Sequence, residues 1–422
     1  MDKDSLYSFL YKEGGSYFLY HQISRSLLEI DEELHHAVSQ NNLTKIPLQT
    51  LETLKLKGFV VDDSYDESVS MQYLNLINRY QNDTLRITIL PTLDCNFRCW
   101  YCYENHKPSR ISSGGLNSIF LFIISEVKSR SLKKIVLDWF GGEPLLCFNN
   151  VVYPFSKRLF MWAKENNVIF HNMITTNGSL INESTALKMN EVKLNHFQIT
   201  LDGCKEQHNK TRFSKHIPDS FSLIIDNIHT LCKIIENPSI ELRVNYTSKN
   251  IDGLMSILPN FNNDVRMFIT LSPHIVWQEA KNISLLTKKI SAFKEKAIEM
   301  GYNTNSPTIS TKSMACYAEN MNQYVINYDM SIYKCTARDF DNRFSIGRLT
   351  AEGGFIPNNL FFTYFAKQSS FMNKECLACN VLPSCLNSNV CIQKVLEGSE
   401  KKCMKETIEK EIVRFIKYRL RK

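Results

Sequence analysis

The stretch Cys95-Asn96-Phe97-Arg98-Cys99-Trp100-Tyr101-Cys102 spaces three cysteines as C-x3-C-x2-C, shortly after an apolar segment, residues 85–90, that has the pattern of a β-strand. Soft thiolate ligands suit iron–sulfur clusters, and three of them can hold three irons of a [4Fe–4S] cube. A fourth cysteine is missing nearby, which leaves one iron open to an exogenous ligand. The stretch therefore predicts a reactive cluster on the loop after the first strand.

Beyond this loop, strand-like and helix-like segments alternate. The apolar strand candidates are residues 85–90, 135–140, 169–175, 196–201, 240–246 and 267–271, and the helical stretches between and after them include 116–127, 151–166, 182–191, 221–235 and 285–300. Strict alternation favours parallel strands joined by right-handed crossovers. The predicted fold class is α/β, a partial (β/α)6 TIM-like barrel, in which chemistry lies on the loops after the strands.

The flanking regions have different patterns. Residues 1–80 predict a winged-helix-like module: a hairpin at 16–21 and 26–30, a helix capped by Asp31 and ending at Ser39, a helix at 48–56, and a return strand at 59–61. The polar run 62–70 is its expected linker. The barrel domain is predicted over 81–301, and a loop-rich, cysteine-dense domain over 302–422. This last domain ends in a helix whose stripe, Ile408, Ile412, Phe415 and Ile416, predicts docking on the core.

Composition narrows the function classes. The chain has 422 residues, 43% hydrophobic and 22% charged, with a net charge of +7 that is spread along the sequence, so neither nucleic-acid nor membrane binding is expected. The N-terminus lacks a secretion-signal pattern, and the expected location is cytoplasmic. In that compartment thiols stay reduced, so most of the 13 cysteines predict metal or cluster ligation. Cys147, Cys204 and Cys232 are expected to be small buried hydrophobes.

Short polar motifs follow the later strands in order. They are Gly141-Gly142-Glu143-Pro144, Thr176-Asn177-Gly178, Thr200-Leu201-Asp202-Gly203, His208 with Arg212, and Arg243-Val244-Asn245. Glycines allow close backbone approach to a ligand, and a carboxylate suits an ammonium group. Any one of these motifs has a plain interpretation as a turn, a cap or a surface charge. Together, in this order, they indicate a ligand site.

These motifs resemble the signatures of the radical S-adenosylmethionine (SAM) superfamily. The resemblance implies that the open iron binds SAM, and that the reduced cluster cleaves it to a 5′-deoxyadenosyl radical that abstracts hydrogen. It implies that Glu143 meets the amino group of SAM, Arg212 its carboxylate, Asn245 its ribose and Tyr101 its adenine. The full set of implied SAM contacts is Tyr101, Gly141, Gly142, Glu143, Asn177, Thr200, Asp202, Arg212 and Asn245.

The C-terminal cysteines resemble the SPASM domain of radical SAM enzymes that modify peptides. The resemblance implies one auxiliary [4Fe–4S] cluster on Cys376, Cys379, Cys385 and Cys403, and a second on Cys316, Cys335 and Cys391. Two features depart from the family pattern: Met330 stands where glycine is usual, and five residues rather than three separate Cys385 from Cys391. The second departure leaves open whether there are one or two auxiliary clusters. Zinc is the alternative for the later cysteines.

The predicted function is maturation of a ribosomally made precursor peptide, bound by its leader to residues 1–80 and cross-linked by a thioether, C–C or C–O bond. A flavodoxin or ferredoxin is the expected reductant, and Asp339 is a candidate for a general base. The alternatives are a formylglycine-generating sulfatase maturase, a peptide dehydrogenase or epimerase, and a zinc-binding adaptor without catalysis. The start of the cluster motif near residue 95, and Thr336 after Cys335, argue against the sulfatase maturase.

Overall fold

The computed structural model describes residues 2–80, 83–276, 278, 283–304, 316–337, 340–366, 371, 373–385 and 403–420. The chain forms two compact units. Unit 1 comprises residues 1–82, 306–321 and 362–422, and unit 2 comprises residues 83–305 and 322–361. None of the helices in the described ranges is long and apolar enough to span a membrane. The three-domain boundaries expected from the sequence stay a prediction.

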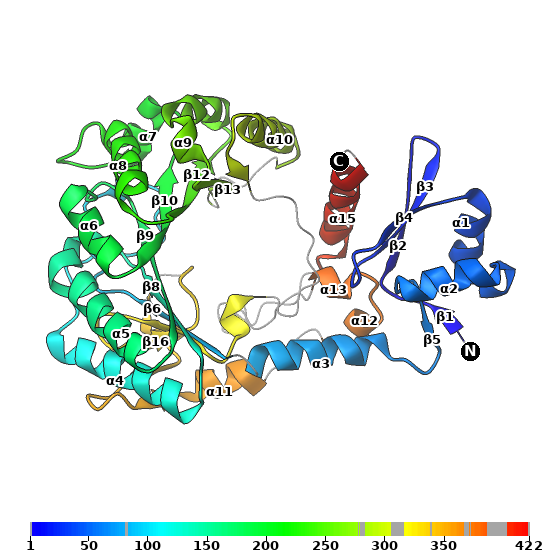
Figure 1. Cartoon of the computed structure of the whole chain (residues 1–422), viewed down its shortest axis with the longest axis horizontal. Coiled ribbons are helices and arrows are strands. Elements are labelled where there is room, and N and C mark those ends of the chain that lie inside the picture. The colour runs from blue at the N-terminus through cyan, green and yellow to red at the C-terminus, as the bar shows by residue number, and fades with distance from the viewer. Residues whose placement is uncertain are drawn as a thin grey trace. The chain divides into compact units, whose positions relative to one another are not determined.

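Unit 2 is built on one large mixed sheet, which confirms the predicted α/β class. Six parallel strands lie side by side in chain order: β6 (Thr84–Ile89), β8 (Lys134–Trp139), β9 (Ile169–Thr176), β10 (Leu194–Leu201), β12 (Ser239–Tyr246) and β13 (Ile269–Ile275). The main crossover helices are α4 (Ser113–Ser129), α5 (Tyr153–Glu165), α6 (Glu183–Glu191) and α8 (Ser220–Ile234), with α10 (Ile283–Glu299) after β13. Figure 1 shows these strands along an arc, with α4, α5, α6 and α8 on its outer side.

Strand periodicity explains this packing. On β8, Ile135, Leu137 and Trp139 are fully buried, and Trp139 packs edge-on against Phe155 of α5 at 5.7 Å between ring centroids. The alternate positions point to the inner face of the arc, because successive side chains of a strand point to opposite faces. Asp138, for example, accepts a hydrogen bond from the Thr88 hydroxyl of β6 at 3.4 Å. The outer face of β8 thus packs into the core, and its inner face carries the polar side chain of Asp138.

The sixth strand begins two residues later than the sequence predicted and is longer. Residues Asn263–Arg266 form the short helix α9, which Met267 ends, so the chain reaches the sheet only at Ile269. The sheet continues on the side of β6 opposite to β8. There β6 pairs in parallel with β15 (Gln323–Ile326), and the antiparallel strands β16 (Ser331–Tyr333), β17 (Gly347–Leu349) and β18 (Phe355–Pro357) extend the sheet. A two-residue strand, β14 (Asn303–Thr304), lies beyond β13.

The turn between β15 and β16 contains the departure from the expected glycine. Met330 has a φ of +69°, the left-handed conformation that glycine adopts without steric cost. Its N–H donates to the Asn327 carbonyl at 2.9 Å, and the N–H of Ser331 donates to the Asp329 carboxylate at 3.1 Å. The turn therefore retains a glycine-like geometry even though a methionine occupies the position.

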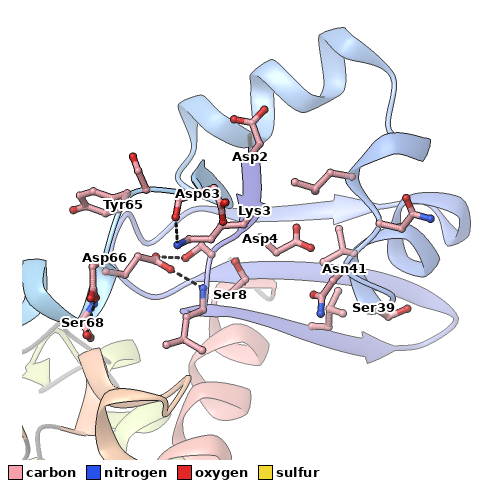
Figure 2. A pocket seen from close by; sticks show the side chains of 18 of the residues that line it. Asp2, Lys3, Asp4, Ser8, Ser39, Asn41, Asp63, Tyr65, Asp66 and Ser68 are labelled. Atoms are coloured by element: carbon pink, nitrogen blue, oxygen red, sulfur yellow. Dashed lines mark hydrogen bonds between the residues drawn. The ribbon is translucent and has the colours of Figure 1, made fainter. Parts of the chain in front are cut away.

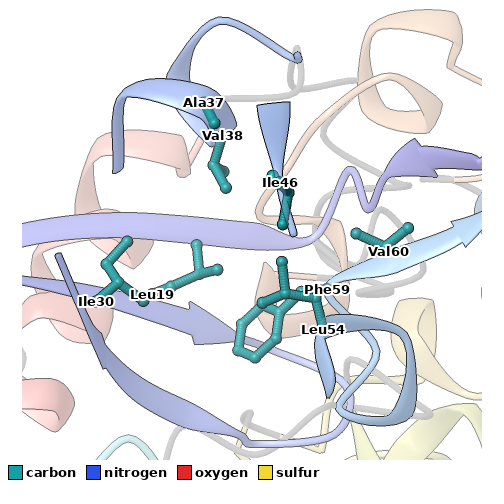
Figure 3. Packing of buried hydrophobic residues seen from close by; sticks show 8 residues of the cluster. All are labelled: Leu19, Ile30, Ala37, Val38, Ile46, Leu54, Phe59 and Val60. Carbon is teal, nitrogen blue, oxygen red and sulfur yellow. The ribbon is translucent and has the colours of Figure 1, made fainter. Parts of the chain in front are cut away.

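The N-terminal residues of unit 1 form a sheet with helices. Strands β2 (Ser8–Glu13), β3 (Ser16–His21) and β4 (Leu27–Ile30) are antiparallel, and β1 (Asp2–Asp4) pairs with β5 (Val60–Asp62). Helix α1 (Glu32–Ser39) begins as predicted, because the Asp31 carboxylate accepts from the Leu34 N–H at 2.7 Å. Helix α2 is Leu48–Leu56. The apolar cluster in Figure 3 joins these elements through Leu19, Ile30, Ala37, Val38, Ile46, Leu54, Phe59 and Val60.

Two sequence-based expectations for this region need correction. Strand β2 was not predicted, because its letters, SFLYKE, mix polar and apolar residues without a strict alternation. The expected linker 62–70 is too long: helix α3 (Glu67–Tyr80) already begins at Glu67. The Asp66 carboxylate accepts from the Ser68 N–H at 2.9 Å and the Val69 N–H at 3.1 Å, so the polar residues start a helix instead of a linker.

Unit 1 also includes the C-terminal residues, which pack directly on the N-terminal sheet. Helix α15 (Lys405–Leu420) buries Ile408, Ile412, Phe415 and Ile416, as predicted, and they cluster with Tyr20 of β3 and Val381. Two short helices precede it, α12 (Lys374–Leu377) and α13 (Leu382–Cys385). The Gln22 amide oxygen accepts from the Ser384 hydroxyl at 2.8 Å. Residues some 360 positions apart therefore share one core.

Candidate active site

The three-cysteine loop follows β6 and rests on the Gly-Gly-Glu turn that follows β8. The N–H groups of Gly142 and Glu143 donate to the carbonyls of Thr92 and Asp94 at 3.1 and 2.8 Å. Gly141 has a φ of +113°, and a Cβ on it would lie 2.4 Å from the Thr92 carbonyl oxygen. A Cβ on Gly142 would lie 2.1 Å from the Asp94 carbonyl oxygen. In this structure both glycines thus allow close approach to the loop backbone that leads into Cys95.

Glu143 is fully buried beneath this turn. Its carboxylate accepts from the Thr176 hydroxyl at 2.7 Å, the Asn177 N–H at 2.7 Å and the Leu145 N–H at 2.9 Å. Burial raises the pKa of the Glu143 carboxyl, and these hydrogen bonds oppose the rise. The motifs after β8 and β9 are therefore joined by one carboxylate, and both of its oxygens already have partners inside the protein.

Asn177 connects the end of β9 to the cysteine loop. Its side-chain amide donates to the Asn96 side chain at 2.8 Å and lies 3.9 Å from the Cys95 sulfur. Its oxygen accepts from the N–H and hydroxyl of Ser179 at 2.9 and 2.6 Å, and Asn96 in turn donates to the Ser179 hydroxyl. Asn96 and Ser179 were not predicted as site residues; their position next to Cys95 and Asn177 was the available signal.

A second group of predicted residues meets at the Tyr101 hydroxyl. This hydroxyl donates to Asp202 at 2.7 Å and accepts from Arg212 at 2.8 Å and Asn245 at 3.1 Å. A short antiparallel ribbon positions Arg212: β7 (Arg98–Cys99) pairs with β11 (Arg212–Phe213), which places Arg212 directly opposite Cys99. Residues that are up to 144 positions apart are thus linked through one phenol group.

This second group has unused hydrogen-bonding capacity. Asp202 is 1% exposed and Arg212 is 7% exposed, yet Asp202 Oδ1 and Arg212 Nε are buried without a hydrogen-bond partner. Burial raises the pKa of Asp202. Burial alone would lower the pKa of Arg212, but Cys99, Tyr101 and Asp202 outweigh it and raise the pKa further. An orphaned carboxylate oxygen beside an orphaned guanidinium N–H fits a ligand with both an ammonium and a carboxylate group.

The remaining predicted residues sit around this pair. Thr200 is buried on β10, two residues before Asp202, and pairs across the sheet with Arg243 of β12. Arg243 donates to the Asn245 side chain at 3.1 Å. His208 is fully buried in α7 (Lys205–Thr211), and its Nδ1 accepts from the Asp202 N–H at 3.2 Å, which fixes the turn that carries Asp202. All nine predicted SAM contacts therefore lie on, or next to, the loops after β6, β8, β9, β10 and β12.

The three thiols of the loop are chemically suited to an iron–sulfur cluster. All are free, and burial raises the pKa of Cys95 to about 12 and that of Cys102 to about 11. Thiols in such surroundings become thiolates only beside positive charge, which iron supplies. In the described ranges no three His, Cys, Asp or Glu side chains converge on a single-ion site. The ligands of a [4Fe–4S] cube each bind a different iron, so they surround the cube and do not meet at a single ion.

Two residues near Cys102 were also not predicted as site residues from the sequence. His106 Nε2 lies 3.1 Å from the Cys102 sulfur, and the position of this histidine four residues after the cysteine was the available signal. Glu104 is 9% exposed, and burial raises its pKa to about 8. Both residues are part of the immediate surroundings of the third cysteine.

The C-terminal cysteines are divided between the two units. Cys376, Cys379, Cys385 and Cys403 belong to unit 1, where Cys379 and Cys385 pack on the cluster of Val381 and α15. Cys316, at the start of a 3-10 helix, also belongs to unit 1, whereas Cys335, after β16, belongs to unit 2. Cys391 and Asp339 lie outside the described residues. The predicted auxiliary ligand sets stay predictions.

Comparison with known proteins agrees with this arrangement. Residues 89–248 match the Radical SAM superfamily. A cysteine-type anaerobic sulfatase-maturating enzyme of Clostridium novyi is 26% identical over 322 residues, 69% of this chain and 84% of that enzyme. The radical SAM cyclopropyl synthase TigE of Paramaledivibacter caminithermalis is 22% identical and aligns with 61% of this chain and 63% of that protein.

Two solved structures share the fold. Native anSMEcpe with bound AdoMet (SAM) matches with a TM-score of 0.60 and 20% identity, over 80% of this chain and 98% of that one. Streptococcus suis SuiB bound to precursor peptide SuiA matches with a TM-score of 0.52 and 13% identity, over 95% of this chain and 98% of that one. Residues 89–248 therefore carry a radical SAM domain, and that family is enzymatic. The chain is homologous to anaerobic sulfatase-maturating enzymes. A radical SAM domain implies SAM and a [4Fe–4S] cluster as cofactors.

Proposed function

We propose that this protein is a radical SAM maturase that abstracts hydrogen from a residue of a ribosomally made precursor peptide and installs a cross-link. The observation that carries the proposal is the pairing of the three-cysteine loop with the orphaned polar atoms of Asp202 and Arg212 at the carboxyl ends of the parallel strands. The cluster and SAM, when bound, supply a 5′-deoxyadenosyl radical. The protein's own residues hold, orient and enclose these groups.

The role of each site residue follows from its contacts. Cys95, Cys99 and Cys102 hold the cluster, and the Gly141–Glu143 turn with Asn177 fixes the loop that presents them. Asp202 binds the ammonium group of SAM, and Arg212 binds its carboxylate. Tyr101 would lie against the adenine of bound SAM, and Asn245 would meet its ribose hydroxyls. The sequence instead assigned the SAM amino group to Glu143. We prefer Asp202 for this role, because both carboxylate oxygens of Glu143 already accept hydrogen bonds within the protein.

The N-terminal part of unit 1 offers a place for the peptide's leader. A cavity of about 1130 Å³ opens there beside β2, which is an edge strand of the described sheet. Its lining includes Ser8 of β2, Ser39 at the end of α1, Asn41 just after that helix, and the carboxylates of Asp4 and Asp66 (Figure 2). An extended peptide can pair with an exposed strand edge through its main chain. The acidic lining favours a leader with basic side chains.

The match to SuiB, whose structure was solved with its precursor peptide, supports a peptide substrate. That structure covers 95% of this chain, whereas the sulfatase-maturase structure covers 80%. A fold that is covered this far by a structure solved with a precursor peptide supports a peptide substrate. Product mass separates the remaining alternatives, because a cross-link loses two hydrogens, as a dehydrogenation does, and epimerisation loses none. Tandem mass spectrometry then separates a cross-link from a dehydrogenated residue by its missing backbone fragments.

The test is anaerobic turnover by the reconstituted enzyme of a candidate precursor peptide, chosen from short open reading frames near the gene, with and without its leader. We expect a product two mass units lighter, one 5′-deoxyadenosine per cross-link, and a strong preference for the full-length precursor. Formylglycine on a sulfatase-derived peptide would instead establish the sulfatase maturase. Absence of SAM cleavage with dithionite, together with zinc in place of iron, would establish the adaptor.

The leader site is tested by filling the cavity. Deleting residues 1–70 would expose the α15 core around Tyr20, so a point variant is sharper. Ser39→Trp places a large ring in the cavity lining and should raise KM for the full-length precursor about tenfold or more, with uncoupled SAM cleavage unchanged. The matched control is Ser129→Trp. Both serines end their helices, and both hydroxyls donate to the carbonyl three residues back. Equal KM values for the two variants would remove the leader site from this cavity.

A further inference from the structure

The β7–β11 ribbon has two faces with different properties. Directly paired residues of an antiparallel ribbon point to the same side. Cys99 pairs with Arg212, which is 7% exposed and turns toward Tyr101, so this face belongs to the active site. Arg98 pairs with Phe213, and their side chains point the other way, where Phe213 is 54% exposed. The outer surface is thus separated from a cluster ligand by the thickness of one ribbon.

The ribbon and the residues next to it carry exposed apolar and basic side chains. Phe213 is exposed on the ribbon itself, and Trp100, which directly follows β7 and packs edge-on against Tyr101 at 5.5 Å between ring centroids, is 53% exposed. Both side chains offer aromatic contact area. Lys210 and Lys215 are exposed on the segment that carries Phe213. The Arg98 guanidinium lies 3.7 Å from the Asp94 carboxylate, so the two lysines provide most of the uncompensated charge. Glu206 is the exposed acidic residue of the same segment, and the neighbouring Lys205 and Asp219 neutralise one another at 2.6 Å.

We propose that this face, Arg98, Trp100, Lys210, Phe213 and Lys215, is the docking site of an acidic one-electron carrier protein that reduces the cluster. The inference rests on the proposed function, which consumes one electron for each SAM cleaved. One electron leaves the reduced carrier, which is thereby oxidised, and arrives at the cluster held by Cys95, Cys99 and Cys102. No bond is formed or broken and no proton moves in this step. Charge complementarity selects an acidic carrier, and the aromatic pair forms the dry centre of the contact.

The decisive experiment reverses the two lysines. Lys210→Glu/Lys215→Glu should weaken binding of an acidic flavodoxin, measured by calorimetry at low salt, roughly tenfold. The KM for reduced flavodoxin in SAM cleavage should rise by the same factor, and kcat with dithionite should stay at the wild-type value. Both effects should shrink as salt is added, because exposed charges are screened beyond about 10 Å at 0.1 M.

The matched control is Lys128→Glu/Lys133→Glu. Lys128 lies in the last turn of α4 as Lys210 lies in the last turn of α7, Lys133 is an exposed loop lysine like Lys215, and the net charge changes equally. A second variant, Phe213→Ser, should weaken flavodoxin binding at high salt as well, because its contribution is apolar. Equal flavodoxin affinity for wild type, the control and both docking-face variants would overturn the proposal. If wild type fails to cleave SAM even with dithionite, the proposed function itself fails, independently of the binding measurement.

Discussion

The substitution Gly142→Ala tests whether the Gly-Gly-Glu turn acts by supporting the cysteine loop. The added Cβ would lie 2.1 Å from the Asp94 carbonyl oxygen and 2.6 Å from that of Leu93, whereas ordinary contact begins at 3.4 Å. These are backbone atoms that cannot rotate away, so the loop before Cys95 must retreat by about 1 Å. Overpacking of this kind costs about 1–3 kcal/mol. Loss of the hydrogen bond from Glu143 N–H to Asp94, 2.8 Å long, adds about 1 kcal/mol.

We therefore expect the free energy of unfolding to fall by about 2–4 kcal/mol and the melting temperature of unit 2 by roughly 5–10 °C. The assay is calorimetry on cluster-free protein, so that a contact between Gly142 and SAM cannot contribute. Iron content after reconstitution should fall in parallel, because the displaced loop carries Cys95. The control is Gly114→Ala in α4, where the nearest atom would be 3.9 Å away and a small stabilisation is expected. Equal melting temperatures for the two variants would refute the reasoning.

Four further predictions follow from single contacts. Met330→Gly should be about 1 kcal/mol more stable than Met330→Ala in urea unfolding, because both remove the side chain beyond Cβ and only alanine is strained at a φ of +69°; equal stability would contradict the turn geometry. Tyr101→Phe should destabilise SAM-free protein by about 1–3 kcal/mol, since the buried oxygen of Asp202 loses its 2.7 Å hydrogen bond. Ile412→Ala should cost about 2–5 kcal/mol and Ile412→Val about 1 kcal/mol, because the side chain is fully buried between α15 and the N-terminal sheet. Burial lowers the pKa of His21 from 6.5 to about 4, so between these pH values the unfolded chain binds more protons than the folded chain. The contribution of His21 to the stability of unit 1, measured by hydrogen exchange, should be fully present above pH 6.5 and decrease towards pH 4. His21→Asn should reduce this pH dependence.

The sequence alone determined those features that depend on neighbouring residues. The C-x3-C-x2-C spacing, the strand periods, the Asp31 cap and the apolar stripe of α15 are set by residues within a few positions of one another. Apart from the missed strand β2 and the later start of β13, each was found where predicted. The order of motifs after successive strands further indicated that they would meet, because parallel strands bring their carboxyl ends to one edge. This is why the α/β class and the gathering of the site residues could be inferred before any coordinates.

The tertiary structure decided which buried polar atoms have hydrogen-bond partners within the protein and which do not. Both oxygens of Glu143 are bonded to the ends of β8 and β9, whereas Asp202 and Arg212 keep unused atoms, and no local pattern distinguishes these carboxylates. The Cys99–Arg212 ribbon and the joining of Tyr20 to α15 likewise connect residues that are more than 100 positions apart. Such pairings are fixed by chain topology and by the requirement that buried polar groups find partners, and a sequence window carries neither constraint.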